Sequence, residues 1–152
     1  MSPEKVPYFL DSGRMSARLL ELDGQVDQAD QMWDRLATTF AASPELDNML
    51  DEWARMNLKH QRYERSDEIY GRLIKDLPNS RFSGTARLSL AESEMQANHL
   101  DAALNEFIAI SMNETYADQE KEAALFHVVD IYAAQQKWPD VIKSAEQFVV
   151  SY

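Results

Sequence analysis

Four stretches of the chain repeat one pattern: GQVDQADQMWDRL from Gly24, QRYERSDEIYGRL from Gln61, NHLDAALNEFIAI from Asn98 and QKWPDVIKSAEQF from Gln136. Their first residues are 37, 37 and 38 positions apart. A period of this length is typical of proteins in which one supersecondary unit is stacked several times. The repeat therefore governs how the rest of the sequence is interpreted.

Apolar and small residues recur inside each stretch at spacings of three, four and three. In the first copy they are Val26, Ala29, Trp33 and Leu36, and the other copies keep a similar register. Residues at these spacings lie on one face of an α-helix, so each stretch is predicted to be an amphipathic helix. A second helical stretch precedes each of these helices. It carries a marker residue, small in most copies, at the point where the two helices of the pair are expected to approach closely. The four markers are Ala17, Ala54, Ala91 and Val129.

The pattern predicts an all-α fold of four antiparallel helix pairs. The chain has only 4 glycines and 5 prolines, and this scarcity of turn residues argues against a protein of many short strands. The expected helices lie near residues 6–22, 26–41, 45–60, 63–77, 81–97, 100–112, 117–135 and 138–151. Ser43 before Pro44 is typical of a helix start. Thr115 and Asp118 resemble a capping pair, and Gly24 fits a tight turn.

The paired pattern resembles the tetratricopeptide repeat (TPR) family, with repeats at about 10–46, 47–83, 84–121 and 122–152. The matching positions are the small Ala17, Ala54 and Ala91 and the aromatic Trp33, Tyr70 and Phe107. The resemblance implies one domain over residues 1–152, folded as a right-handed superhelical solenoid. The period exceeds the usual ~34 residues, and polar Asn57 and Glu94 occupy a place that is usually tyrosine. Longer units of this kind resemble those of bacterial envelope-assembly and Tol-Pal-associated proteins.

Composition excludes several classes of function. The 152 residues carry 15 Lys and Arg against 26 Asp and Glu, a net charge of −11, so nucleic acid is repelled by the chain as a whole. Cysteine is absent, and the three histidines have no partner at metal-ligand spacing. No glycine-rich phosphate loop or nucleophile signature occurs. We therefore expect no cofactor, no metal and no catalytic role.

The TPR resemblance places the first helix of each pair along a concave groove that binds a peptide or a partner helix. The residues that it assigns to this groove are Arg14, Arg18, Asn48, Glu52, Arg55, Lys59, Glu92, Met95, Phe126, His127 and Asp130. Leu88 joins them as an apolar position.

Two halves of this predicted groove differ in chemistry. Arg14 and Arg18, and then Arg55 and Lys59, are spaced four apart, which predicts a locally basic half that suits an acidic partner segment. The alternative is that these cations pair with carboxylates of the same helices. In the other half Phe126 and its neighbours either offer apolar contacts to a partner or belong to the core between repeats.

The leading functional hypothesis is a non-catalytic protein-interaction scaffold. The alternative is a structural oligomerisation segment, because Phe148, Val149 and Val150 leave an apolar edge with no polar capping helix. The sequence has no apolar run long enough for a secretory signal or a membrane span, so we expect a soluble segment of a longer protein. The expected compartment is either the bacterial periplasm or cell envelope, or the cytoplasm.

Overall fold

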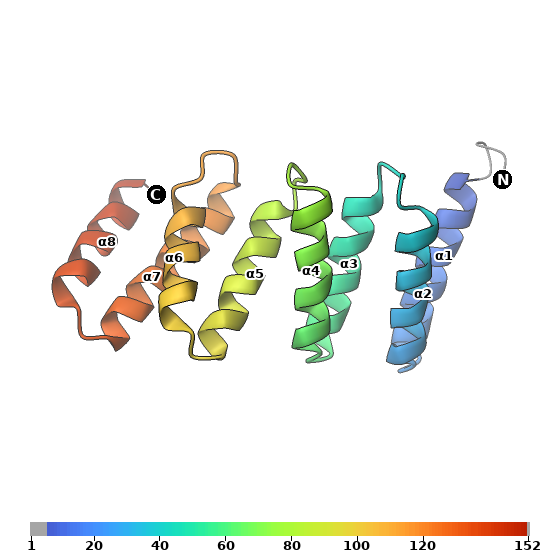
Figure 1. The fold of residues 1–152 in the computed structure, drawn as a ribbon, viewed down its shortest axis with the longest axis horizontal. Helices are drawn as coiled ribbons and strands as arrows, with labels where there is room; N and C mark the ends of the chain where they lie inside the picture. Colours follow the sequence, from blue (N-terminus) through green and yellow to red (C-terminus); the bar gives the residue numbers. More distant parts are fainter. Residues whose placement is uncertain (1–5, 152) are drawn as a thin grey trace. The chain divides into compact units, whose positions relative to one another are not determined.

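A computed structural model describes residues 6–151 of the chain, and its regular structure over that range is helical throughout (Figure 1). The helices are α1 (Val6–Leu22), α2 (Val26–Thr39), α3 (Leu46–Lys59), α4 (Tyr63–Asp76), α5 (Ser83–Gln96), α6 (Leu100–Ser111), α7 (Asp118–Ala134) and α8 (Trp138–Ser151). The predicted all-α class is confirmed for these residues. The superhelical path and its handedness remain predictions.

The helices divide between two compact units. Unit 1, Met1–Leu77, contains α1 to α4, and unit 2, Pro78–Tyr152, contains α5 to α8. Within each unit every helix packs against the next one along the chain, and in unit 2 α5 also contacts α7. Each unit is therefore a stack of two helix pairs. A single solenoid over residues 1–152 stays a prediction.

One turn joins the two helices of every pair. Its central residue has a positive φ: 79° at Gly24, 59° at Gln61, 64° at Asn98 and 58° at Gln136. The next residue donates its N–H back to a carbonyl five positions earlier, as from Gln25 to Leu20 at 2.8 Å. This left-handed cap satisfies carbonyls that the helix end leaves free and reverses the chain within two or three residues.

The core of unit 1 is built from the residues that the repeat pattern identified. The aromatic positions Trp33 and Tyr70 are buried, and so are the small positions Ala17 and Ala54. Gly13 of α1 lies so close to Leu36 of α2 that an added Cβ would collide with that side chain. Small residues on the first helices thus allow the close approach that the sequence predicted.

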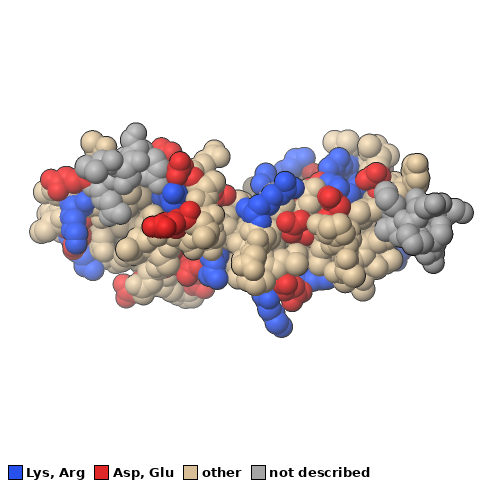
Figure 2. Space-filling model, turned by 90° about the horizontal axis from the view of Figure 1, so that it is seen from above, with Lys and Arg blue, Asp and Glu red and all other residues tan. Residues whose placement is uncertain are grey.

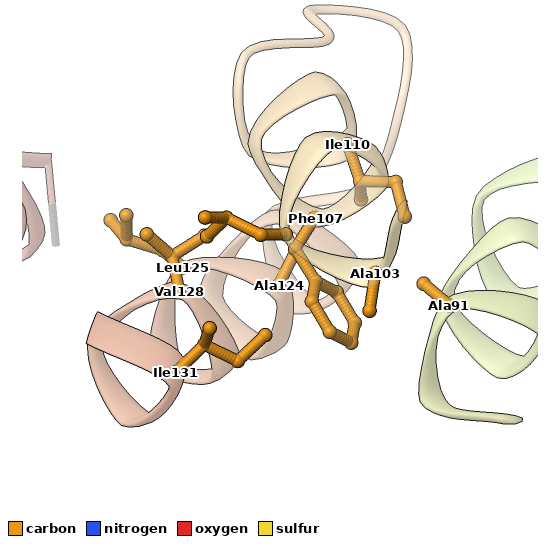
Figure 3. Close-up of a cluster of buried hydrophobic side chains, with 9 residues drawn as sticks. Ala91, Ala103, Phe107, Ile110, Ala124, Leu125, Val128 and Ile131 are labelled. Carbon is orange, nitrogen blue, oxygen red and sulfur yellow. The ribbon is translucent and has the colours of Figure 1, made fainter. Parts of the chain in front are cut away.

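Unit 2 has its own core, drawn in Figure 3. Phe107 of α6 is fully buried, with its ring directed between α5 and α7, near Ala91 and Ile131. Ala103 faces Ala91 across the α5–α6 contact. Val128 completes the α7 side of the cluster. The same aromatic and small positions therefore organise both cores.

Two details of the predicted register are wrong. The fourth buried marker is Val128, not Val129, because the extra residue of the last repeat lies within α7, after Val128. The markers Ala91 and Val128 are 37 positions apart, whereas α5 and α7 end 38 positions apart, at Gln96 and Ala134. The first apolar position of the second helices is exposed in two of them, at Tyr63 and Trp138, each of which opens its helix, whereas Leu100 packs partly buried against the unit 2 core.

The predicted helix starts also need correction. Glu45 caps α3, and Ser43 instead accepts the Glu45 N–H at 3.2 Å within the preceding turn. Ala117 occupies the N-cap position of α7 without a side-chain cap hydrogen bond, and Thr115 donates its N–H and its hydroxyl to Asn113 Oδ1. In both places a side chain forms a hydrogen bond within the preceding turn: the Ser43 hydroxyl in one and the Asn113 amide oxygen in the other. These side chains therefore do not cap the following helix.

Candidate functional site

An open groove runs between α1 and α3 in unit 1, and we call it the unit 1 groove. Its volume is about 310 Å³. Its lining consists of Arg18 and Glu21 from α1, Trp33 from α2, and Glu52, Arg55, Met56 and Lys59 from α3. The two first helices form its walls, and the buried Trp33 belongs to the second helix beneath them.

Helical spacing explains why these side chains converge. Arg14, Arg18 and Glu21 are four and three residues apart on α1, which places them along one side of that helix. Glu52, Arg55 and Lys59 are three and four apart on α3. The two rows face each other across the groove, and each row contains two cations and one carboxylate.

The carboxylates of the groove hold its cations in place. Glu52 accepts hydrogen bonds from Arg18 at 3.2 Å from Nε and 2.8 Å from Nη2, and it also pairs with Arg14. At the other end Glu21 lies 2.7 Å from Lys59 Nζ and 3.2 Å from His60 Nε2. These contacts join α1 to α3, which are separated by a full repeat in sequence.

Opposing effects set the acidity of Glu21. Burial alone would raise the pKa of this carboxyl, but hydrogen bonds and charge from Lys59 and His60 outweigh it, so the pKa of Glu21 is lowered. Glu21 is therefore held ionised between its two partners.

Asp51 behaves in the opposite way. It is almost fully buried, pairs with Arg55 at 3.0 Å and faces the Tyr70 hydroxyl at 3.5 Å. Burial raises the pKa of the Asp51 carboxyl despite the charge of Arg55. Burial and the neighbouring Asp51 charge likewise raise the pKa of Tyr70, so this phenol remains protonated. Asp51, beside Tyr70, thus holds the Arg55 side chain in place next to the groove.

Cations and carboxylates differ in what they present to solvent. The side chains of Arg18, Arg55 and Lys59 are 50%, 59% and 66% exposed. Those of Glu21 and Glu52 are 16% and 21% exposed. Figure 2 shows basic and acidic side chains next to one another over unit 1. A molecule entering the groove therefore meets the cations first.

The structure gathers most of the predicted basic residues and leaves one predicted residue apart. Arg14 lies with the groove residues through its pairing with Glu52. Asn48 lies a turn nearer the start of α3, where its amide donates to Glu45 at 3.2 Å. The alternative that the cations pair with carboxylates is thus realised, mainly between helices rather than within them.

In unit 2 the predicted residues form a second cluster around His127 of α7. His127 Nε2 lies 3.1 Å from Glu92 of α5, and its ring stacks on Phe107 with centroids 4.7 Å apart. Phe126 meets the same ring edge-on at 6.1 Å and is more than half exposed. Met95 packs against the core instead of facing solvent. Asp130 of α7 is exposed.

Sequence reasoning missed the residues that shape the groove floor. Trp33 and Met56 line the groove although the repeat pattern assigns Trp33 to the core. A signal was present, since Trp33 is the aromatic position of the second helix that packs against both α1 and α3. The sequence pattern could not show how much of the Trp33 ring would line the groove.

Other kinds of site are not found in the part of the chain that the structure describes. No group of three or more His, Cys, Asp or Glu residues could hold a metal there. None of the described helices combines the length and the apolar character needed to cross a bilayer.

Comparison with known proteins adds no assignment. The sequence matches no protein-family model and no curated protein.

Proposed function

We propose that the chain is a TPR-like protein-interaction module, without catalytic role, that binds an acidic segment of another protein in the unit 1 groove. The observation that carries the proposal is the outward placement of Arg18, Arg55 and Lys59 above the more buried Glu21 and Glu52. A groove between helices is a surface for an extended peptide or a helix rather than an enclosed pocket.

The inner carboxylates support this proposal rather than oppose it. Glu52 accepts hydrogen bonds from two arginines, and Glu21 contacts both Lys59 and His60. Because each carboxylate is shared between two partners, the cations keep N–H donors that are not used in these pairs. A guanidinium offers five N–H donors and can hold a second carboxylate on its free edge. The fixed pairs also restrict the long side chains before a partner arrives, which lowers the entropy lost on binding.

A binding assay with synthetic peptides tests the proposal. We expect a fluorescently labelled peptide of alternating glutamate and serine to bind in a salt-sensitive manner, although the protein carries a net charge of −11. The double variant Arg55→Gln/Lys59→Gln should weaken the affinity at least about tenfold, because two charge-assisted contacts are lost.

Arg87→Gln is the matched control. Arg87 also pairs with a carboxylate, Glu106 at 2.8 Å, and is similarly exposed, but it belongs to unit 2. We expect this variant to bind the acidic peptide as the wild type does. Absence of binding by the wild type, or equal loss in both variants, would overturn the proposal.

A further inference from the structure

Helix α1 is apolar on two opposite faces, and only one of them is covered. Leu10 and Ala17 are buried on the inner face, and Gly13 between them touches Leu36 of α2. The outer face carries large apolar side chains that are each more than half exposed. They are Tyr8, Met15, Leu19 and Leu22.

The spacing of these side chains makes them a continuous stripe. Tyr8, Met15 and Leu22 recur every seven residues, with Leu19 between the last two. At about 100° per residue the stripe lies about 180° around the helix from Leu10 and Ala17. It extends for about 21 Å along α1, at a rise of 1.5 Å per residue. A seven-residue apolar repeat of this kind suits pairing with another helix.

We propose that this stripe pairs with the same stripe of a second copy of the chain, with the two α1 helices antiparallel. The charges beside the stripe select this occupant and this orientation. Asp11 and Arg18 flank the same edge of the stripe, seven residues apart. About a two-fold axis near Met15, Asp11 of each copy faces Arg18 of the other, and Tyr8 faces the second copy's Leu22.

Both charged groups are available for this contact. Asp11 is exposed and makes no ion pair with another described residue. Arg18 is half-exposed and donates to Glu52 from Nε and Nη2, so its Nη1 edge is the one directed away from that pair. In a parallel two-fold pair the edge that carries Asp11 and Arg18 would meet the opposite edge of the second stripe, so Asp11 and Arg18 could not pair with each other across the contact. The antiparallel arrangement gains two symmetric ion pairs around an apolar centre.

Sedimentation velocity over a wide range of protein concentration tests the proposal. We expect a monomer–dimer equilibrium whose dissociation constant rises at least about tenfold in Leu19→Glu. Ile142→Glu is the matched control, because Ile142 of α8 is 59% exposed against 57% for Leu19. It should leave the dimer unchanged. A strict monomer, or dissociation by Ile142→Glu with none by Leu19→Glu, would overturn the proposal.

A charge-exchange experiment tests the orientation. Asp11→Arg alone and Arg18→Asp alone should each weaken self-association, because like charges then meet across the axis. An equimolar mixture of the two variants should restore a dimer, since each opposite-charge pair is rebuilt between unlike copies. Circular dichroism of each variant confirms that it is folded. Failure of the mixture to associate better than either folded variant would contradict the antiparallel pairing.

Discussion

At the scale of single residues, Asp30 of α2 ties the two helix pairs of unit 1 together. Its Oδ1 accepts hydrogen bonds from Trp53 Nε1 at 2.7 Å and from Asn57 Nδ2 at 3.1 Å, both on α3. Arg65 of α4 reaches the same oxygen at 3.3 Å while its guanidinium lies 4.8 Å above the Trp53 ring. One carboxylate therefore connects three helices.

This arrangement gives the buried Asn57 its hydrogen-bond partners, at a position where the TPR resemblance predicts tyrosine. The Asn57 side chain is fully buried and donates both to Asp30 and to the Trp53 carbonyl. A polar side chain at this depth is tolerated only with such partners. The Asn57 amide nitrogen is thus satisfied within this contact.

Asp30→Ala should lower the free energy of unfolding by about 2–3 kcal/mol. The reason is that it leaves the buried Trp53 Nε1–H and one N–H of the Asn57 amide without an acceptor. Urea denaturation followed by circular dichroism measures the change. Asp34→Ala, one helical turn further along α2 at an exposed position, serves as the control and should change stability little. A loss below about 0.5 kcal/mol in Asp30→Ala would contradict the role given to this carboxylate.

Glu21 makes the stability of unit 1 dependent on pH. Its pKa is lowered in the folded state below the ordinary value of 4.5, so its ionised form stabilises the fold. That contribution is fully present above about pH 4.5 and is lost as the pH falls through the folded pKa. In Glu21→Gln we expect the stability difference from wild type to shrink on acidification through this window. Denaturation curves at several pH values measure it, and a difference independent of pH would refute the assignment.

At the scale of the helical elements, the inter-helix turn imposes the same backbone on four different residues. Gly24 adopts a positive φ without cost and Asn98 does so readily, whereas glutamine at positions 61 and 136 has a Cβ that opposes this conformation. The turn is nevertheless kept in all four pairs, because its hydrogen bonds and the packing of both helices outweigh the local strain.

Gln136→Gly should therefore raise the free energy of unfolding by about 0.5–1 kcal/mol, since relief of the left-handed strain exceeds the added entropy of the unfolded chain. Gln135→Gly is a close control, because Gln135 has φ of −81° and gains nothing from glycine. Thermal or urea denaturation of both variants checks the sign. A destabilising Gln136→Gly would show that the glutamine side chain matters more than the backbone.

At the scale of the whole molecule, each unit has its own buried core. Trp33 and Tyr70 lie at the centre of the first, and Phe107 at the centre of the second. In proteins built of stacked repeats, stability is a sum over units and their neighbours. A core substitution is thus expected to act first within its own unit.

Phe107→Ala should cost about 3–5 kcal/mol within unit 2, because it removes a fully buried ring and leaves a cavity. Hydrogen exchange followed by mass spectrometry locates the effect. We expect faster exchange of amides in α5 to α7, with a smaller change in α1 to α4. Equal loss of protection throughout the chain would show that the two cores unfold as one.

The net charge of −11 also has to be considered for the whole molecule. The acidic excess is not spread evenly, because Arg18, Arg55 and Lys59 present their charges around one groove while the carboxylates that hold them lie deeper. We therefore expect a negatively charged segment to be attracted to this groove although the chain as a whole repels it. This contrast makes the ionic-strength dependence of peptide binding informative.

The sequence alone determined the helices and their order, because the spacing of apolar and small residues within a few helical turns is a local signal that can be recognised in the sequence. It indicated the convergence of Arg14, Arg18, Arg55 and Lys59, since helical spacing fixes which side chains share a face. Only the tertiary structure decided which carboxylate each cation meets, as with Lys59 and Glu21, 38 positions apart. The same holds for the Asp30 contacts and for the uncovered stripe of α1. Such pairings depend on how neighbouring helices pack, and a local pattern does not encode their distance or burial.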